Sequence, residues 1–251
     1  MCVGMAGRAS QAVGTRWYVR RVVPNLQPRR ALDVRQHHPL GTSTGHLAEQ
    51  RGDWSALAWE ALRTSVFAAE LAALSEDELP GLIAYLGSGI ELPFRFLSVH
   101  GPVKQRRMSE ADMVATLAAL PATVDAIVVH PDLIEDASLY ARLGSRLAIE
   151  NMDARKRGGR TADELQPLFD ALPDAGLCFD VAHAWSIDPT MEEGERLLDR
   201  FAGRLRHVHV SSLDADGSHA PLTPEHEDLF EHTLGRCLGV PWILEAPLPE
   251  R

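Results

Sequence analysis

Short apolar runs alternate with helical patterns along the chain from residue 39 onward. The runs are rich in β-prone residues, which is typical of buried strands. We expect eight strands, at residues 39–44, 65–71, 94–100, 126–130, 146–150, 176–180, 205–210 and 242–245. Between them lie signals for the start of a helix. Each is a hydroxyl or carboxylate side chain, followed either by a helical apolar pattern or by an acidic residue three positions later. These signals are Asp53, Ser75 with Glu78, Ser109 with Asp112, Thr161 with Glu164, Thr190 with Glu193, and Thr223 before Pro224.

Eight strands joined by helical crossovers predict an α/β protein, a (β/α)8 TIM barrel in a single domain over residues 37–251. An open, doubly wound sheet is the alternative, but no GxGxxG motif follows the first expected strand. Only six residues follow Glu245, so we expect the barrel to lack its final helix. The seam there would stay partly open, or be covered by the N-terminal segment or by a second subunit of a homo-oligomer.

The formal net charge of −10 is unevenly distributed along the chain. Residues 1–36 carry seven arginines and one acid, Asp33, and we expect them to form a basic, disordered extension; an arginine-rich targeting peptide is the alternative. No run of about 18 apolar residues is present, so no membrane-spanning helix is expected. The three cysteines, at Cys2, Cys178 and Cys237, form no CxxC pair, which indicates a reducing compartment such as the cytoplasm.

Side chains that can bind metals end six of the eight expected strands. They are His100, His130, Glu150, Asp180, His209 and Glu245, and two more histidines, His183 and His219, follow just beyond strand ends. Because barrel strands end at one rim and side chains alternate along each strand, these groups are expected to face a common centre. Carboxylates and imidazoles converging among apolar residues are costly unless a divalent cation joins them. The pattern therefore predicts a metal site.

Six short segments carry a family resemblance. They are FLSVHGP (96–102), VVHPD (128–132), IENMD (149–153), CFDVAHA (178–184), HVHVS (207–211) and ILEAP (243–247). Together they resemble the xylose isomerase-like TIM barrels over roughly residues 39–247. That superfamily includes sugar-phosphate isomerases, ketose 3-epimerases and the endonuclease IV branch, AP endonuclease family 2.

The isomerase and epimerase branch implies one divalent metal, such as Mn, Mg, Co or Zn, bound by four residues. Mapped onto this sequence, they are Glu150, Asp180, His209 and Glu245. In that branch the metal polarises a carbonyl and stabilises an enediolate, while Glu150 and Glu245 act as the catalytic residues that remove and return a proton. His183 corresponds to a contact with a substrate oxygen. The acidic body of the chain favours this interpretation.

The endonuclease IV branch implies a cluster of three zinc ions that hydrolyses a phosphodiester. It adds His100, His130, His183 and His219 to the ligand set. The ninth expected ligand is an aspartate two residues before His219, where this sequence has Gly217; Asp216 stands one residue away. The number of metals therefore stays open at this point, and a non-catalytic metal-binding barrel is a third hypothesis.

Two basic clusters follow the third and fifth expected strands, on the predicted catalytic face. They are Lys104, Arg106 and Arg107, and Arg155, Lys156, Arg157 and Arg160. Guanidinium groups suit phosphate geometry, so we expect a small anionic substrate such as a sugar phosphate. The acidic body opposes wrapping of a nucleic acid, which needs an extended basic surface. Two inward residues, Cys178 and His207, are interpreted as a small core residue and a packing residue beneath the ligands.

Overall fold

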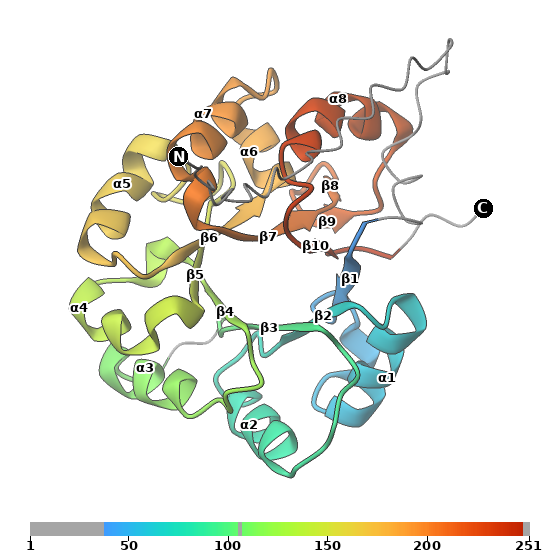
Figure 1. The fold of residues 1–251 in the computed structure, drawn as a ribbon, viewed down its shortest axis with the longest axis vertical. Coiled ribbons are helices and arrows are strands. Elements are labelled where there is room, and N and C mark those ends of the chain that lie inside the picture. Colours follow the sequence, from blue (N-terminus) through green and yellow to red (C-terminus); the bar gives the residue numbers. More distant parts are fainter. Residues whose placement is uncertain (1–37, 105–106, 248–251) are drawn as a thin grey trace, which may run out of the picture.

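Eight parallel strands close into a barrel in a computed structural model of the chain, which describes residues 38–104 and 107–247 (Figure 1). Around the barrel the strand order is β1, β10, β7, β6, β5, β4, β3, β2. The strands are β1 Leu40–Ser43, β2 Ala68–Ala72, β3 Phe96–His100, β4 Ala126–Val129, β5 Leu147–Glu150, β6 Gly176–Asp180, β7 Leu205–Val210 and β10 Trp242–Leu244. All eight lie within or across the ranges expected from the sequence, so the (β/α)8 prediction is confirmed.

The helices form a ring outside the barrel (Figure 1). They are α1 Trp54–Thr64, α2 Leu79–Gly87, α3 Glu110–Ala118, α4 Ala137–Tyr140, α5 Ala162–Ala171, α6 Val181–Ile187, α7 Glu192–Phe201 and α8 Pro224–Gly235. Short 3-10 turns occupy Ala48–Gln50, Pro131–Leu133, Ala141–Arg146 and Ala202–Arg204, and a small antiparallel pair, β8 Ser212–Leu213 and β9 His219–Ala220, follows β7. Most of the hydrophobic core lies between this ring and the outward faces of the strands.

Four of the six helix-start signals are confirmed. Asp53, Ser109, Thr161 and Thr223 each accept a backbone N–H of the first helical turn. The signal at Ser75 was partly right, because the Glu78 carboxylate accepts the backbone N–H of Ser75 at 2.9 Å. It was wrong about the start of the helix, since α2 begins only at Leu79, just before a proline that favours the first helical turn.

The signal at Thr190 was also wrong. The residue before α7 is Met191, which has a left-handed backbone (φ 64°) and makes no side-chain cap. The carboxylate of Asp188 takes over that role, because it accepts hydrogen bonds from the backbone N–H groups of Thr190 and Glu193.

The inside of the barrel is lined by small side chains. Ala126, Val128, Ala148 and Cys178 form a separate buried cluster there, against Phe96. Small residues at these positions leave space in the barrel interior for the polar side chains nearer its carboxyl-terminal rim. The arrangement matches the sequence expectation that small or apolar residues lie one pleat below the metal-binding groups.

No helix follows β10 among the described residues, which end at residue 247. In Figure 1 the ring of helices is interrupted between α8 and α1, beside the pairing of β10 with β1. The basic segment expected at residues 1–36 lies outside the described residues. Within the described part, no helix is long and apolar enough to cross a membrane.

Gly41 allows β1 to approach β2 closely. A Cβ atom at this position would lie 2.4 Å from the backbone oxygen of Ala68. We expect Gly41→Ala to lower the free energy of unfolding by about 1–3 kcal/mol, because the strand cannot move away without opening the barrel. Denaturant unfolding measures this, with Gly203→Ala as the control, since a Cβ at Gly203 meets nothing within 4 Å. Equal stability of the two variants would contradict the prediction.

Candidate metal centre

The carboxyl-terminal rim of the barrel encloses a cavity of about 640 Å³. Six of the eight metal-binding side chains expected from the sequence line it: His100, His130, Glu150, His183, His219 and Glu245. The other two, Asp180 and His209, are fully buried. The structure therefore brings together side chains from β3, β5, β6 and β7 with groups from the segments that follow β4, β6 and β10.

The eight side chains fall into three overlapping groups, each with its ligand atoms within 4.8 Å of one another. The groups are His100, His130 and Glu150; Glu150, Asp180, His209 and Glu245; and Asp180, His183 and His219. The second group is the set implied by the isomerase branch. The other two contain the additional histidines of the endonuclease IV branch.

Glu150 connects the first two groups through its two carboxylate oxygens. Its Oε1 lies 3.1 Å from Nδ1 of His209. Its Oε2 lies 3.3 Å from Nε2 of His100 and 3.1 Å from Nε2 of His130. A carboxylate whose oxygens face different imidazole groups has the arrangement of a bridging ligand between two ions.

Hydrogen bonding fixes the orientation of His100. Its Nδ1 lies 2.9 Å from the backbone oxygen of Gly101, and because a carbonyl only accepts, Nδ1 carries the proton. In the neutral ring Nε2 is then a lone pair that faces the Glu150 carboxylate. Two electron-pair donors facing each other at 3.3 Å need a proton or a cation between them.

The polar atoms of the centre fit a divalent cation. Asp180 is fully buried, yet its Oδ2 accepts no hydrogen bond from any described residue. The Nδ1 atom of the partly buried His130 is also buried without a hydrogen-bond partner there. Buried polar atoms without partners are costly. Imidazole nitrogens mixed with carboxylate oxygens suit Mn²⁺, Fe²⁺, Co²⁺ or Zn²⁺. The residues present therefore fit a metal centre.

The shifted pKa values of the ionisable groups in the centre support the same conclusion. Burial raises the pKa of Glu245 well above its ordinary value, and the charges of Asp180 and Glu150 raise it further. Burial also opposes ionisation of Glu150, but attraction to His209 and hydrogen bonds from the surrounding imidazoles hold its pKa well below the ordinary value. The pKa of His209 is raised well above the ordinary value against the effect of burial, because anionic groups surround the ring. Without a cation, the centre therefore keeps protons that a metal would displace.

Comparison with known sequences finds one matching family model. The model of the xylose isomerase-like TIM barrel family matches residues 132–246, which include β5, β6, β7 and β10. The described residues before them complete the same barrel, and the resemblance seen in the six sequence segments is confirmed.

Two solved structures with TM-scores above 0.5 show the same fold. The apo form of 3-keto-D-glucoside 4-epimerase YcjR from E. coli gives a TM-score of 0.51 at 12% identity, covering 85% of this chain and 94% of that chain. A D-psicose 3-epimerase in the presence of D-fructose gives 0.54 at 14% identity, covering 84% and 86%. An AP endonuclease, family 2, from Brucella melitensis gives 0.48 at 14% identity, covering 85% and 94%. No curated protein sequence matches the chain.

Glu70 lies behind His209 of the centre and was missed in the sequence. It lies on β2, is fully buried, and its Oε2 is 3.1 Å from Nε2 of His209. Hydroxyls of Ser43 and Ser98 donate to its two oxygens at 3.2 and 2.9 Å. Its pKa is held well below the ordinary value because attraction to His209 and the hydrogen bond with that ring outweigh burial. The available signal was one acid in the otherwise apolar run Ala-Ala-Glu-Leu-Ala.

Glu70 orients His209 so that Nδ1 faces Glu150 and Glu245. We expect Glu70→Gln to weaken metal binding by about 10- to 100-fold, the usual effect of losing a hydrogen-bond partner behind a histidine ligand. Glu70→Asp should recover part of the affinity, because it keeps the charge. Titration calorimetry with Mn²⁺ measures the loss, and unchanged affinity in Glu70→Gln would contradict this role.

Asn151 is a second residue that the sequence did not single out. Its side-chain amide pairs with the backbone of Asp180 as a neighbouring strand would. Its Nδ2 donates to the backbone oxygen of Asp180 at 2.9 Å, and its Oδ1 accepts the backbone N–H of Asp180 at 2.8 Å. Its own backbone oxygen lies 2.9 Å from Nδ1 of His183. Asn151 thereby fixes the spacing between Glu150, its neighbour in the chain, and Asp180.

The basic residues expected around the site occupy different environments. Lys104, Arg155 and Lys156 line the cavity, and Arg155 forms a two-pronged ion pair with Asp153. Lys156 pairs with Asp132 at 3.0 Å. The remaining expected cations are not among the lining residues.

Outside the cavity, Arg107 pairs with Asp77 and Arg160 with Glu164, whereas Arg157 is exposed. Arg106 lies outside the described residues. Asp216, considered as a substitute for the missing ninth ligand, is exposed and belongs to none of the ligand groups found among the described residues; its carboxylate accepts the backbone N–H of Ser218.

Proposed function

We propose that this barrel is a metal-dependent hydrolase of a small phosphate ester such as a sugar phosphate. The observation that supports it is Glu150, whose two oxygens face two separate groups of imidazoles. A single ion on Glu150, Asp180, His209 and Glu245 would leave His100 and His130 without a ligand role. The sequence alone favoured the isomerase interpretation, and this arrangement reverses the preference.

The three overlapping groups would hold the ions. Divalent cations supply Lewis-acid stabilisation of a phosphoryl group and make water nucleophilic near neutral pH. Glu245 lines the cavity, and with ions bound in place of its proton its carboxylate would be placed to take a proton from the attacking water and return it to the leaving oxygen. His183 and His219 line the same cavity and contact the substrate or complete the ligand set.

The cations at the cavity mouth favour a phosphate over a neutral sugar. Lys104, Arg155 and Lys156 come from the segments after β3 and β5 and face the same space. Arg155 is held rigidly by Asp153, so its guanidinium is presented in a fixed orientation. The net charge of −16 over residues 37–251 still opposes binding of a long polyanion such as DNA.

An isomerase or epimerase acting beside a carbonyl is the second candidate. It is favoured by one feature of the centre: Oε1 of Glu150 and Oε1 of Glu245 lie 3.1 and 3.2 Å from the same nitrogen of His209. Two carboxylates around one point match the requirement for removing a proton from one face of a carbon and returning it to the other.

Metal content and a paired substrate panel distinguish the two candidates. We expect two or three ions per chain by elemental analysis, and release of inorganic phosphate from sugar phosphates. Lys104→Ala and Arg155→Ala should each raise KM by about tenfold or more through loss of a charged hydrogen bond, whereas Arg157→Ala should not. One ion per chain with interconversion of unphosphorylated ketoses would instead support the isomerase.

A further inference from the structure

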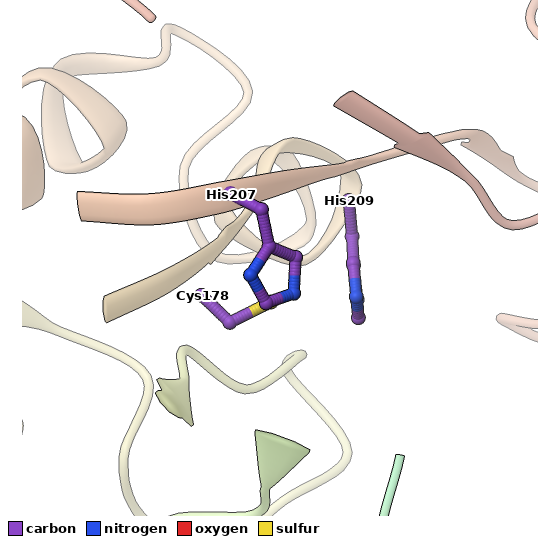
Figure 2. Close-up of side chains that lie close together, drawn as sticks. All are labelled: Cys178, His207 and His209. Atoms are coloured by element: carbon purple, nitrogen blue, oxygen red, sulfur yellow. The ribbon is translucent and has the colours of Figure 1, made fainter. Parts of the chain in front are cut away.

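A second set of ligand-type side chains lies inside the barrel, one pleat below the rim. Cys178 on β6 and His207 and His209 on β7 each offer one ligand atom, and these atoms lie within 4.8 Å of one another. All three residues are fully buried. Figure 2 shows Cys178 beside the His207 ring, with His209 next along the strand.

An irregularity in strand pairing brings these side chains together. The register between β6 and β7 shifts at Leu177 and Cys178, so that Cys178 pairs with His207 and Asp180 with His209. Regular pairing from Leu177 would place Arg206 opposite Cys178 instead. The shift therefore aligns the thiol with one inward imidazole and the rim carboxylate with the other.

Glu70 adds a carboxylate oxygen to this interior group. Its Oε2 lies 3.6 Å from Nε2 of His207 and 3.1 Å from Nε2 of His209. Ser43 and Ser98 hold the carboxylate from the other side through their hydroxyls. The carboxylate thus lies against both of the imidazoles that gather beside the Cys178 thiol, and all four residues are buried.

His207 is the observation that points to a ligand. Neither of its ring nitrogens has a hydrogen-bond partner among the described residues, although the ring is fully buried. An imidazole in that state carries a substantial free-energy penalty. A cation between Nε2 of His207 and the Glu70 carboxylate would remove the penalty for both groups.

We propose that Glu70, Cys178, His207 and Nε2 of His209 form a second divalent-cation site, separate from the catalytic centre. One sulfur, two nitrogens and one oxygen make a closed, four-coordinate set that suits Zn²⁺ in a structural role. Binding displaces one proton from the Cys178 thiol and one from Nε2 of His209, and loading of the rim centre would also displace the Nδ1 proton, leaving the ring as an imidazolate. No redox partner is required. The His209 ring then spans both sites, because its Nδ1 faces Glu150 and Glu245.

Cobalt substitution of the metal-free full chain tests the proposal. Co²⁺ at this site should give a sulfur-to-cobalt charge-transfer absorption, and the Zn²⁺-loaded protein should show a sulfur neighbour at about 2.3 Å by X-ray absorption. Cys178→Ser should abolish both signals and reduce bound metal by one ion per chain. Cys237→Ser is the matched control, because that thiol is buried just after α8, where it donates to the backbone oxygen of Thr233, and it belongs to none of the ligand groups found among the described residues.

Two further variants keep the proposal falsifiable. His207→Gln, in a folded protein by circular dichroism, should also lose the interior ion. Glu245→Gln should lose metal from the catalytic centre and retain the charge-transfer band, so failure of the proposed hydrolase activity is distinguishable from failure of the interior site. Saturation with Co²⁺ without a thiolate band in the wild-type protein, or a band that survives in Cys178→Ser, would overturn the proposal.

Discussion

Glu150→Gln is expected to remove more bound metal than the loss of any other ligand in the centre. The substitution keeps the size of the side chain but removes the charge that His100, His130 and His209 share. Even outer partners of metal ligands contribute about 10- to 100-fold to affinity, so loss of this shared carboxylate should exceed about 100-fold. Turnover should fall at least in proportion.

Elemental analysis after dialysis, together with titration calorimetry, measures this effect. Glu231→Gln provides the matched control, because that glutamate is exposed on α8. We expect Glu150→Gln to lose ions from the two groups that contain Glu150, including the one with His100 and His130. Asp180→Asn should instead lose ions from the two groups that contain Asp180, including the one with His183 and His219. Retention of full metal content in Glu150→Gln would refute the bridging role.

Loading with Zn²⁺ or Mn²⁺ is expected to raise Tm strongly, and the increase should grow with pH. Free metal at about 1,000 times Kd stabilises a folded protein by about 4 kcal/mol. For a domain of this size, that corresponds to a shift in Tm of about 8–16 °C. Calorimetric scans with and without metal at several pH values measure it.

The sign of the pH effect follows from the shifted groups. The raised pKa of His209 gives the metal-free protein stability that is fully present below the ordinary histidine value of 6.5 and is lost as pH rises through the folded value. The raised pKa of Glu245 acts in the same direction: its contribution to the stability of the metal-free protein is lost as pH rises above the ordinary glutamate value of 4.5. Metal replaces those protons, so its advantage increases as they are lost. A shift in Tm that shrinks between pH 6 and 8 would contradict this assignment.

Much of the barrel could be predicted because hydrophobic periodicity is a local property. Each strand ends in a side chain whose direction follows from strand alternation, and in a barrel all such ends meet at one rim. For that reason His100 and Glu245, far apart in sequence, could be assigned to one centre before any coordinates.

Glu70 and the loops could not be predicted in the same way. Glu70 sits in the middle of β2 rather than at its end, and its partner His209 is 139 residues away. The ion pair of Arg107 depends on where Asp77, 30 residues away, falls in three dimensions, which charge counting along the chain does not reveal. Thr190 failed as a cap for a related reason, since Asp188 competes for the same N–H groups.

The pairing of β1 with β10 also has a consequence for how the protein folds. The centre needs Glu70 from β2 and Glu245 after β10, so its ligands meet only when the first and last strands have joined. Contacts between such distant parts of a chain form slowly, because the loop must close before any of them is gained. The rate of metal binding during refolding would therefore measure the closing of the barrel between β1 and β10, a step that follows the formation of secondary structure.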